Sequence, residues 1–558
     1  MSTSNGRVPV SDVEAVAVAL VIVAATIVLA SYLLDLAGFP FLPLVLLLFA
    51  LAAGARVAAF LLPGAIREPG VRLMAGGTGL VTLAWLLWLA APTLLPLSTG
   101  PDLTHHLLLI RYIEQHWRLV HDPSVERFLG EMAQYTPGSH VLVAVAGAVS
   151  RSDGLRAMHA VQAATVALKV VFLLAVCIRL LPPRVPVSLA MLGPVLLLAS
   201  PRYFLGGFME YGFLAQVVAE LFVVTMWWAI VAWAQQPSSA LLAVFGVAGA
   251  ATFLTWPVYS GPPYLAALLV IALTRQRSLS TRASDGVLAV LPVALIAGVY
   301  LVGRLGWLQL AGTGGSAPWP SVEAFGWPLV LLAAGGFVAA LLVPAGRPVA
   351  VFALAVLAQA GAFYVLATRA GAPQPYMALK MMYLLLWPMA ACAALLCGVI
   401  WRRVIRDADA DRTITRVAAA TVVAVVAVGV VRPLAAQPAK LHPLPPAVSL
   451  PLYRAGLWAG EHAAPGCFEY LVGDDETAYW LHLAVLGNPR MSDRTGDNST
   501  YEPRDAIVRW LTPGGLPYAI VDLPALPSGV REELDIVQQF GTAAVARRRG
   551  ASWCDTRP

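Results

Sequence analysis

A carboxylate and two histidines stand at helical spacing within the polar stretch 99–140, at Asp102, His105 and His106. At positions i, i+3 and i+4 these side chains share one face near the start of a helix. Free backbone N–H groups in the first helical turn keep a carboxylate ionised, as a general base requires. Asp102 and His106 could instead bind a divalent cation such as Mg or Mn, or Asp102 could only cap a surface helix.

A turn with the sequence YTPGSH, at residues 135–140, follows this stretch. It leads into an apolar segment over Val141–Val149 that is too short to cross a bilayer. We therefore predict two helices lying on the membrane surface, the first over Leu103–His121, as a roof above a membrane-embedded site. Tyr135 and His140, together with His105 and His106, would face the substrate, and Glu131 is a weaker candidate.

The composition places these residues in a polytopic membrane protein. The chain has 558 residues, of which 59% are hydrophobic and 12% are charged, and its mean hydropathy is +0.74. Soluble globular proteins of this length are far more polar. About thirteen apolar runs have a length near that needed to span a bilayer, at 13–34, 40–62, 73–95, 157–181, 185–200, 212–234, 239–256, 260–274, 285–305, 327–344, 348–368, 381–401 and 414–432.

Arginine sets the predicted orientation of these spans. Arginines concentrate in alternate connections, such as those around Arg179 and Arg402, so we expect these connections and the N-terminus to be cytoplasmic. The run 13–34 is then a retained anchor. The loop 96–156 and the region after residue 432 fall on the extracytoplasmic face of a bacterial plasma membrane.

The region 433–558 differs from the rest of the chain. It gains acidic and turn residues, and a strand-like run at 517–523 follows a helical pattern at 506–511, which predicts a small α/β domain. Two cysteines, Cys467 and Cys554, lie here, and either a disulfide or two free thiols fit the sequence. The domains are therefore 1–432, membrane-embedded, and 433–558, extracytoplasmic. Three further cysteines in the spans read as buried thiols, namely Cys177, Cys392 and Cys397.

The pattern of spans, acid and turn resembles the GT-C class of polytopic glycosyltransferases. That class has an acid early in the first large extracytoplasmic loop, two juxtamembrane helices and a Tyr-Pro-Pro-Gly-type turn, which correspond here to Asp102, the helix Leu103–His121 and the turn 135–140. Thr136 replaces the common proline, and two spans precede the one that leads into the loop. The layout is similar to actinobacterial cell-envelope arabinosyl- and mannosyltransferases, and the arginine-rich composition is typical of such genomes.

The resemblance implies an inverting transferase that takes arabinofuranose or mannose from a polyprenyl-phosphate donor. Nucleotide sugars are absent outside the cell, and the polar clusters face outward, which independently favours a lipid-linked donor. Asp102 would act as general base on a hydroxyl of a cell-envelope glycan or glycolipid. Glu210, in a later outer loop, could supply a second carboxylate that orients the acceptor hydroxyl or a metal, or it could be an exposed loop acid. No nucleic acid is expected as a partner. The alternatives are a transporter or flippase for a lipid-linked glycan and a non-catalytic assembly subunit.

The donor phosphate needs cations at the outer membrane boundary. Lys380 ends an outer loop just before a span, Arg369 begins the same loop, and Arg202 begins an earlier one. The resemblance supports Lys380 best. Each of the three could instead be an interfacial cation that reaches toward water.

Two aromatic residues and one charged pair complete the candidates. Trp256 and Tyr259 lie near the outer boundary, where they could stack on sugars or simply belong to the aromatic belt of a membrane protein. Lys169 and Glu220 fall inside spans, where ionisable groups are costly and usually paired. We expect a structural Lys169–Glu220 pair; a proton pathway is the transporter alternative.

Overall fold

The structure is a computed structural model of the whole chain. It describes residues 10–65, 68–97, 101–121, 129–200, 212–274, 276–302, 319–406, 417, 420, 424, 427, 442–488 and 501–550.

Helices account for most of the described chain, and one small sheet lies near its C-terminal end. The α-helices are α1 (Asp12–Leu36), α2 (Pro43–Leu61), α3 (Pro69–Leu89), α4 (Pro101–His116), α6 (Gly138–Val149), α7 (Gly154–Leu180), α8 (Leu192–Ala199), α9 (Leu214–Gln235), α10 (Ser239–Thr255), α11 (Gly261–Leu273), α12 (Leu279–Val302), α13 (Val322–Phe325), α14 (Trp327–Leu342), α15 (Arg347–Arg369), α16 (Tyr376–Met382), α17 (Leu386–Arg406), α19 (Leu450–His462), α20 (Asp475–Trp480), α21 (Pro503–Leu511) and α22 (Ser528–Glu532). The strands are β1 (Phe468–Leu471), β2 (Tyr518–Asp522), β3 (Leu534–Phe540) and β4 (Ala543–Arg548).

Apolar helices form the bundle that the sequence predicts. Eight stretches in the described part are long and apolar enough to cross a bilayer, and five shorter apolar helices accompany them. Twelve of the predicted runs coincide with helices of this bundle, and the run 414–432 lies largely outside the described residues. The chain is therefore a multi-pass membrane protein, as the composition indicates.

Small residues let neighbouring helices of the bundle approach closely. A Cβ atom added to Gly336 of α14 would lie 1.9 Å from the carbonyl oxygen of Cys392 on α17. A Cβ on Gly54 of α2 would lie 2.9 Å from the carbonyl oxygen of Ala19 on α1. Such close backbone contacts stabilise helix association inside a membrane, where the hydrophobic effect does not drive it.

The two most buried helices of the bundle are α7 and α9, and they carry the charged pair predicted from the sequence. The Nζ atom of Lys169 lies 2.9 Å from Oε2 of Glu220 and donates to the carbonyl oxygen of Val217 at 3.0 Å. The Lys169 side chain is fully buried, and Nζ also lies 5.6 Å from the ring centroid of Trp387. Each charge is thus compensated inside the bundle, which confirms the predicted pair.

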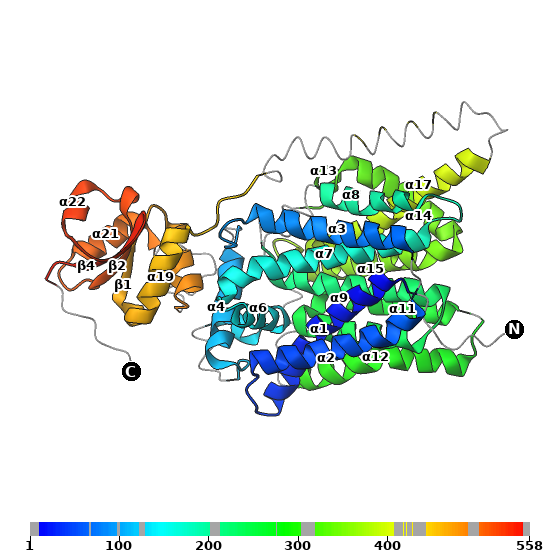
Figure 1. The fold of residues 1–558 in the computed structure, drawn as a ribbon, viewed down its shortest axis with the longest axis horizontal. Helices are drawn as coiled ribbons and strands as arrows, with labels where there is room; N and C mark the ends of the chain where they lie inside the picture. Colours follow the sequence, from blue (N-terminus) through cyan, green and yellow to red (C-terminus); the bar gives the residue numbers. More distant parts are fainter. Residues whose placement is uncertain are drawn as a thin grey trace.

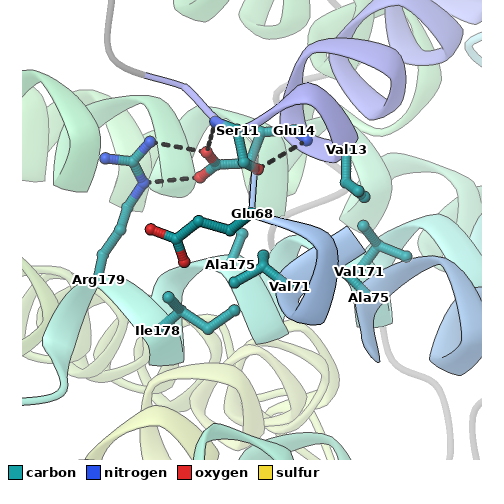
Figure 2. Close-up of a pocket in the computed structure, with 10 residues that line it drawn as sticks. All are labelled: Ser11, Val13, Glu14, Glu68, Val71, Ala75, Val171, Ala175, Ile178 and Arg179. Carbon is teal, nitrogen blue, oxygen red and sulfur yellow. Dashed lines mark hydrogen bonds and ion pairs between the residues drawn. The ribbon is translucent and has the colours of Figure 1, made fainter. Parts of the chain in front are cut away.

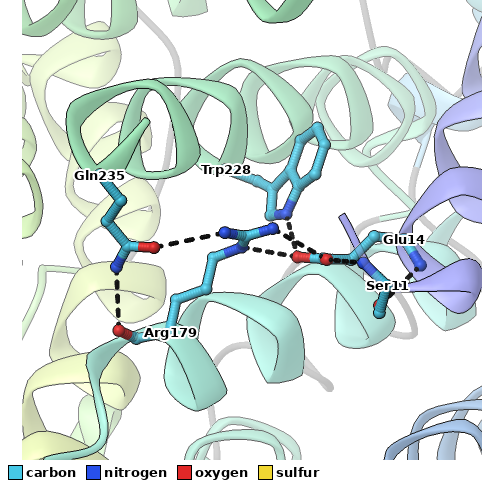
Figure 3. A network of polar contacts seen from close by, with 5 residues as sticks. All are labelled: Ser11, Glu14, Arg179, Trp228 and Gln235. Carbon is cyan, nitrogen blue, oxygen red and sulfur yellow. Dashed lines mark hydrogen bonds and ion pairs between the residues drawn. The ribbon is translucent and has the colours of Figure 1, made fainter. Parts of the chain in front are cut away.

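A second polar network closes the far end of α7. The carboxylate of Glu14 accepts hydrogen bonds from Nε of Arg179 at 2.7 Å and from Nε1 of Trp228 at 2.8 Å (Figure 3). Gln235 donates to the carbonyl oxygen of Arg179 at 2.9 Å. A cavity of about 140 Å³ lies beside Glu14 and Arg179, and the side chain of Glu68 also lines this cavity (Figure 2). Because α7 is about 40 Å long, this end is far from the helix start at Gly154.

The roof helices α4 and α6 lie at the opposite end of the bundle, where α7 begins. Figure 1 shows α4 crossing this end of the bundle, between the bundle and the C-terminal domain. The first roof helix is shorter than predicted, because it ends at His116 rather than His121. Trp117 takes a positive φ of 49°, which stops the helix, and its carbonyl oxygen accepts a hydrogen bond from the backbone N–H of Phe41 at 3.0 Å.

The C-terminal domain contains a four-stranded sheet with the order β1-β2-β4-β3. Strands β1 and β2 are parallel, and the remaining pairs are antiparallel. The predicted strand and helix correspond to β2 and α21. Cys467, just before β1, is disulfide-bonded, while Cys554 lies outside the described residues. The three cysteines of the bundle are free and buried, as predicted.

Candidate active site

Two buried histidines and a partly buried tyrosine form a cluster in the roof. Nδ1 of His106 on α4 lies 2.8 Å from Nε2 of His140 on α6, and the two rings stack with centroids 5.0 Å apart. The Tyr135 ring meets both imidazoles edge-on, at 5.1 Å from His106 and 5.7 Å from His140. Both histidines are almost completely buried. The structure thus brings together three of the residues predicted to face the substrate.

His105 takes a different partner from its neighbour. Successive residues of a helix point about 100° apart, so His105 faces away from the histidine pair and toward the C-terminal domain. Its Nε2 atom lies 2.7 Å from the hydroxyl of Tyr479. Tyr453 of α19 donates to Oδ2 of Asp153 at 2.8 Å, next to the start of α7. The C-terminal domain is therefore docked on the roof, and both lie on the same side of the bundle, as the sequence predicts.

The turn before α6 is held against the end of α10. The hydroxyl of Thr136 donates to the carbonyl oxygen of Thr255 at 2.8 Å. A Cβ on Gly138 would lie 2.5 Å from the Thr255 hydroxyl and 2.9 Å from the carbonyl oxygen of Leu254. The glycine of the predicted turn is thus needed for close approach to α10.

Lys380 lies in a cage of aromatic rings at this end of the bundle. Its Nζ atom is 3.9 Å from the ring centroid of Phe213, 4.4 Å from that of Tyr376 and 4.6 Å from that of Trp256. The residue is 4% exposed. The hydroxyl of Tyr259 donates to its backbone carbonyl at 2.9 Å. The faces of aromatic rings attract an ammonium group without contributing a negative charge of their own, so the cage fixes the position of this cation.

Two consecutive residues, Thr255 and Trp256, connect the turn before α6 to the aromatic cage around Lys380. Thr255 accepts the hydrogen bond from Thr136, and the next residue, Trp256, covers Lys380. Trp256 is 5% exposed and stacks on the fully buried Tyr259 with centroids 5.5 Å apart. Of the two predicted aromatic residues, Trp256 therefore forms part of the cage, and Tyr259 supports it through the stack on Trp256 and the bond to the Lys380 backbone.

Several predicted site residues are not placed by the structure. Asp102 is the second residue of α4, but its side chain and that of Glu131 lie outside the described part, as do Arg202 and Glu210. Arg369 is exposed in the last turn of α15.

Three residues of this region were missed by the sequence analysis. Phe213 and Tyr376 complete the cage, and Tyr479 holds His105. Tyr376 lies four residues before Lys380, so helical spacing alone predicts their contact. Nothing local in the sequence relates Tyr479 to a residue 374 positions earlier.

A metal site does not emerge from the described side chains. Within them, no group of three or more His, Cys, Asp or Glu residues is arranged to hold an ion. His106, the predicted partner of Asp102 in such a site, pairs with His140.

Glu114 is an ionisable group at the junction of roof, bundle and C-terminal domain. Its Oε1 atom accepts a hydrogen bond from the backbone N–H of Gly154 at 2.6 Å, and its side chain is 13% exposed. Burial raises the pKa of Glu114 to about 7, the neighbouring Asp153 carboxylate adds to this rise, and Arg111 opposes it. The carboxyl is therefore easier to protonate in the folded protein than in the unfolded chain.

We expect this carboxyl to make the protein less stable as the pH rises. Because the folded pKa lies above the unfolded one, its contribution is full below about pH 4.5 and is lost as the pH passes 7. Wild-type protein should lose about 2 kcal/mol of stability between pH 5 and pH 8 from this group. Glu114→Gln should flatten that part of the profile, measured by thermal unfolding in detergent. Equal pH profiles for both proteins would contradict the assignment.

The fold and this site define a multi-pass helical membrane protein whose C-terminal α/β domain docks on a two-helix roof. The sequence matches no protein-family model, and no curated protein is similar to it. In structure it is similar to ArnT from Cupriavidus metallidurans in the apo state, with a TM-score of 0.47 and 15% identity over 86% of this chain and 97% of ArnT. It is also similar to the apo oligosaccharyltransferase of Archaeoglobus fulgidus, with a TM-score of 0.45 and 12% identity over 81% of this chain and 70% of that protein. With TM-scores below 0.5, neither similarity assigns an activity to this chain.

Proposed function

We propose that this protein is a membrane glycosyltransferase that transfers a sugar from a polyprenyl-phosphate donor to a cell-envelope glycan or glycolipid. The observation that carries the proposal is the contact between roof and cage, where Thr136 binds Thr255 and the adjacent Trp256 covers Lys380. This contact puts the roof that bears Asp102 next to a buried cation at the end of the bundle. A carboxylate base for the acceptor hydroxyl and a cation for a phosphate leaving group are the two groups that the reaction requires.

In the proposed reaction, Asp102 takes the proton of an acceptor hydroxyl as its oxygen attacks the anomeric carbon. The bond from that carbon to the phosphate oxygen breaks, and polyprenyl phosphate leaves. Lys380 stabilises the charge on the departing phosphate, with Arg202 or Arg369 as a second cation and Glu210 orienting the acceptor. Inversion at the anomeric carbon is proposed from the GT-C resemblance. The same resemblance names arabinofuranose and mannose as the two candidate donor sugars.

We place the roof and the C-terminal domain outside the cytoplasm. The arginine pattern supports this orientation, and so does the disulfide at Cys467, because disulfides persist in oxidising compartments. A donor available on that face is one carried across the membrane on a lipid.

The test is sugar transfer by purified full-length protein in lipid nanodiscs. Radiolabelled polyprenyl-phosphate arabinofuranose and polyprenyl-phosphate mannose are offered separately with an envelope glycan acceptor, with and without EDTA, Mg²⁺ or Mn²⁺. We expect transfer from one of the donors, and the cation series decides whether a metal takes part. Binding of both lipids without transfer from either would contradict the proposal and favour a flippase or an accessory subunit.

Lys380→Met should weaken donor binding more than removal of the other candidate cations. Methionine keeps the length of the side chain and packs well against aromatic rings, but the charge is lost. We expect the KM for the lipid-linked donor to rise by about tenfold or more, because charge-assisted contacts to phosphate are strong. Arg369→Met is the matched comparison, since Arg369 is exposed at the end of α15. An unchanged KM in Lys380→Met would remove this residue from the donor site.

A further inference from the structure

The C-terminal domain contains a cavity of about 700 Å³ between strand β1, helix α21 and the loop that follows this helix. Ligand pockets in proteins typically measure about 300–1,000 Å³. The cavity belongs entirely to this domain and is separate from the lysine cage. Its floor contains the buried side chains of Glu469, Tyr470 and His482, and Arg509 is 43% exposed beside them. The rim is apolar and exposed at Val508 and Leu516.

The floor is built from two fixed polar pairs. Arg509 binds both carboxylate oxygens of Glu469 through Nε and Nη2, each at 3.0 Å. The hydroxyl of Tyr470 lies 2.8 Å from Nδ1 of His482 and accepts from the side-chain amide of Asn488 at 3.3 Å. Glu469, Tyr470 and His482 are each less than 9% exposed. Side chains held in this way present their remaining donors and acceptors in a fixed arrangement.

The loop at 512–516 forms a rigid wall of the cavity. Gly514 takes a positive φ of 87°, and a Cβ on Gly515 would lie 2.3 Å from the carbonyl oxygen of Arg509. Arg548 of β4 donates to the carbonyl oxygens of Trp510 at 3.3 Å and Thr512 at 2.7 Å. The wall is therefore preformed before any ligand arrives, which lowers the entropic cost of binding.

The charges of the floor indicate which ligand it suits. Glu469 neutralises Arg509, so the pair offers no net positive charge to a phosphate or carboxylate. The ion pair uses two of the five N–H donors of the guanidinium, and its carboxylate oxygens have further lone pairs. The neighbouring donors and acceptors of this pair suit the hydroxyl groups of a neutral sugar ring. The apolar rim suits the C–H face of the same ring.

We propose that this cavity binds a neutral carbohydrate segment, with Glu469 and Arg509 contacting its hydroxyl groups. The cavity is connected to the roof through the ring of Tyr501, which lies 5.4 Å from His482 at the floor and 5.4 Å from Tyr479, the partner of His105. Identifying the segment as part of the acceptor glycan rests on the function proposed above. The binding site itself does not.

Binding of soluble arabinan and mannan oligosaccharides to the full-length protein tests the site without any donor lipid. Arg509→Lys keeps the positive charge but loses the two-pronged contact, and Leu516→Trp fills the rim without altering the polar floor. We expect calorimetry to show that each variant binds at least tenfold more weakly than wild type. Arg547→Lys is the matched control, because Arg547 pairs with Asp535 on the opposite part of the sheet. It should bind as wild type does.

Thermal unfolding confirms that the variants fold, and Leu516→Trp keeps the test valid if Arg509→Lys is unstable. Absence of oligosaccharide binding to wild type would overturn the proposal, as would unchanged binding in Leu516→Trp. Preference for a phosphorylated oligosaccharide over the neutral one would also overturn it. Binding without sugar transfer in the nanodisc assay would leave the carbohydrate site standing and remove only its role as the acceptor site.

Discussion

Asp102→Asn should lower the rate of sugar transfer by about 10²–10⁴-fold, the range that general-base catalysis contributes. Asp102 is the second residue of α4, where free N–H groups of the first turn favour an ionised carboxylate. Asparagine has the same size and also accepts hydrogen bonds from these groups, but it cannot take a proton from the acceptor. The loss should therefore appear in kcat, with little change in the KM for the donor.

Asp12→Asn is the matched control for this substitution. Asp12 is also an acid in the first turn of a helix, but it pairs with Arg72 at the end of the bundle opposite the roof. Transfer by Asp12→Asn should equal that of wild type. Unchanged transfer in Asp102→Asn would remove Asp102 from the chemistry.

The sequence predicts those parts of the structure that depend on local residue patterns or on the free-energy cost of burying charged groups. Runs of apolar residues fix the bundle, because a spanning helix satisfies its own backbone. The spacing of His106 and the position of His140 after a Pro-Gly turn indicate that both belong to one roof. Lys169 and Glu220 were expected to meet because an isolated charge among the spans is costly, and they do meet at 2.9 Å.

Contacts between distant segments could not be predicted in this way. The cage around Lys380 takes one ring from before α9, one from after α10 and one from α16. Which aromatic residues meet depends on the packing of three helices rather than on any local pattern. The Glu14–Arg179 pair joins the start of α1 to the end of α7. Locally, the capping box of Ser11 and Glu14 indicates where α1 begins, but it does not indicate that Glu14 meets Arg179.

The buried Lys169–Glu220 pair should produce the largest stability effect in the chain. Lys169→Met or Glu220→Gln should each destabilise the protein by about 3–5 kcal/mol, because the partner is left as an uncompensated buried charge. Thermal unfolding in detergent measures this loss. Asp535→Ala in the exposed pair with Arg547 is the control, and it should cost no more than about 1 kcal/mol.

Replacing both partners separates a structural role for the pair from a role in proton movement. The double variant Lys169→Met, Glu220→Met should recover most of the stability that either single variant loses, since apolar side chains of similar size replace a buried ion pair at little cost. If the pair is structural, the double variant should also retain sugar transfer. A double variant that is stable but inactive would instead show that the charges move protons or act on substrate. The combination of stability and activity therefore decides whether the two buried charges only stabilise the bundle or also take part in function.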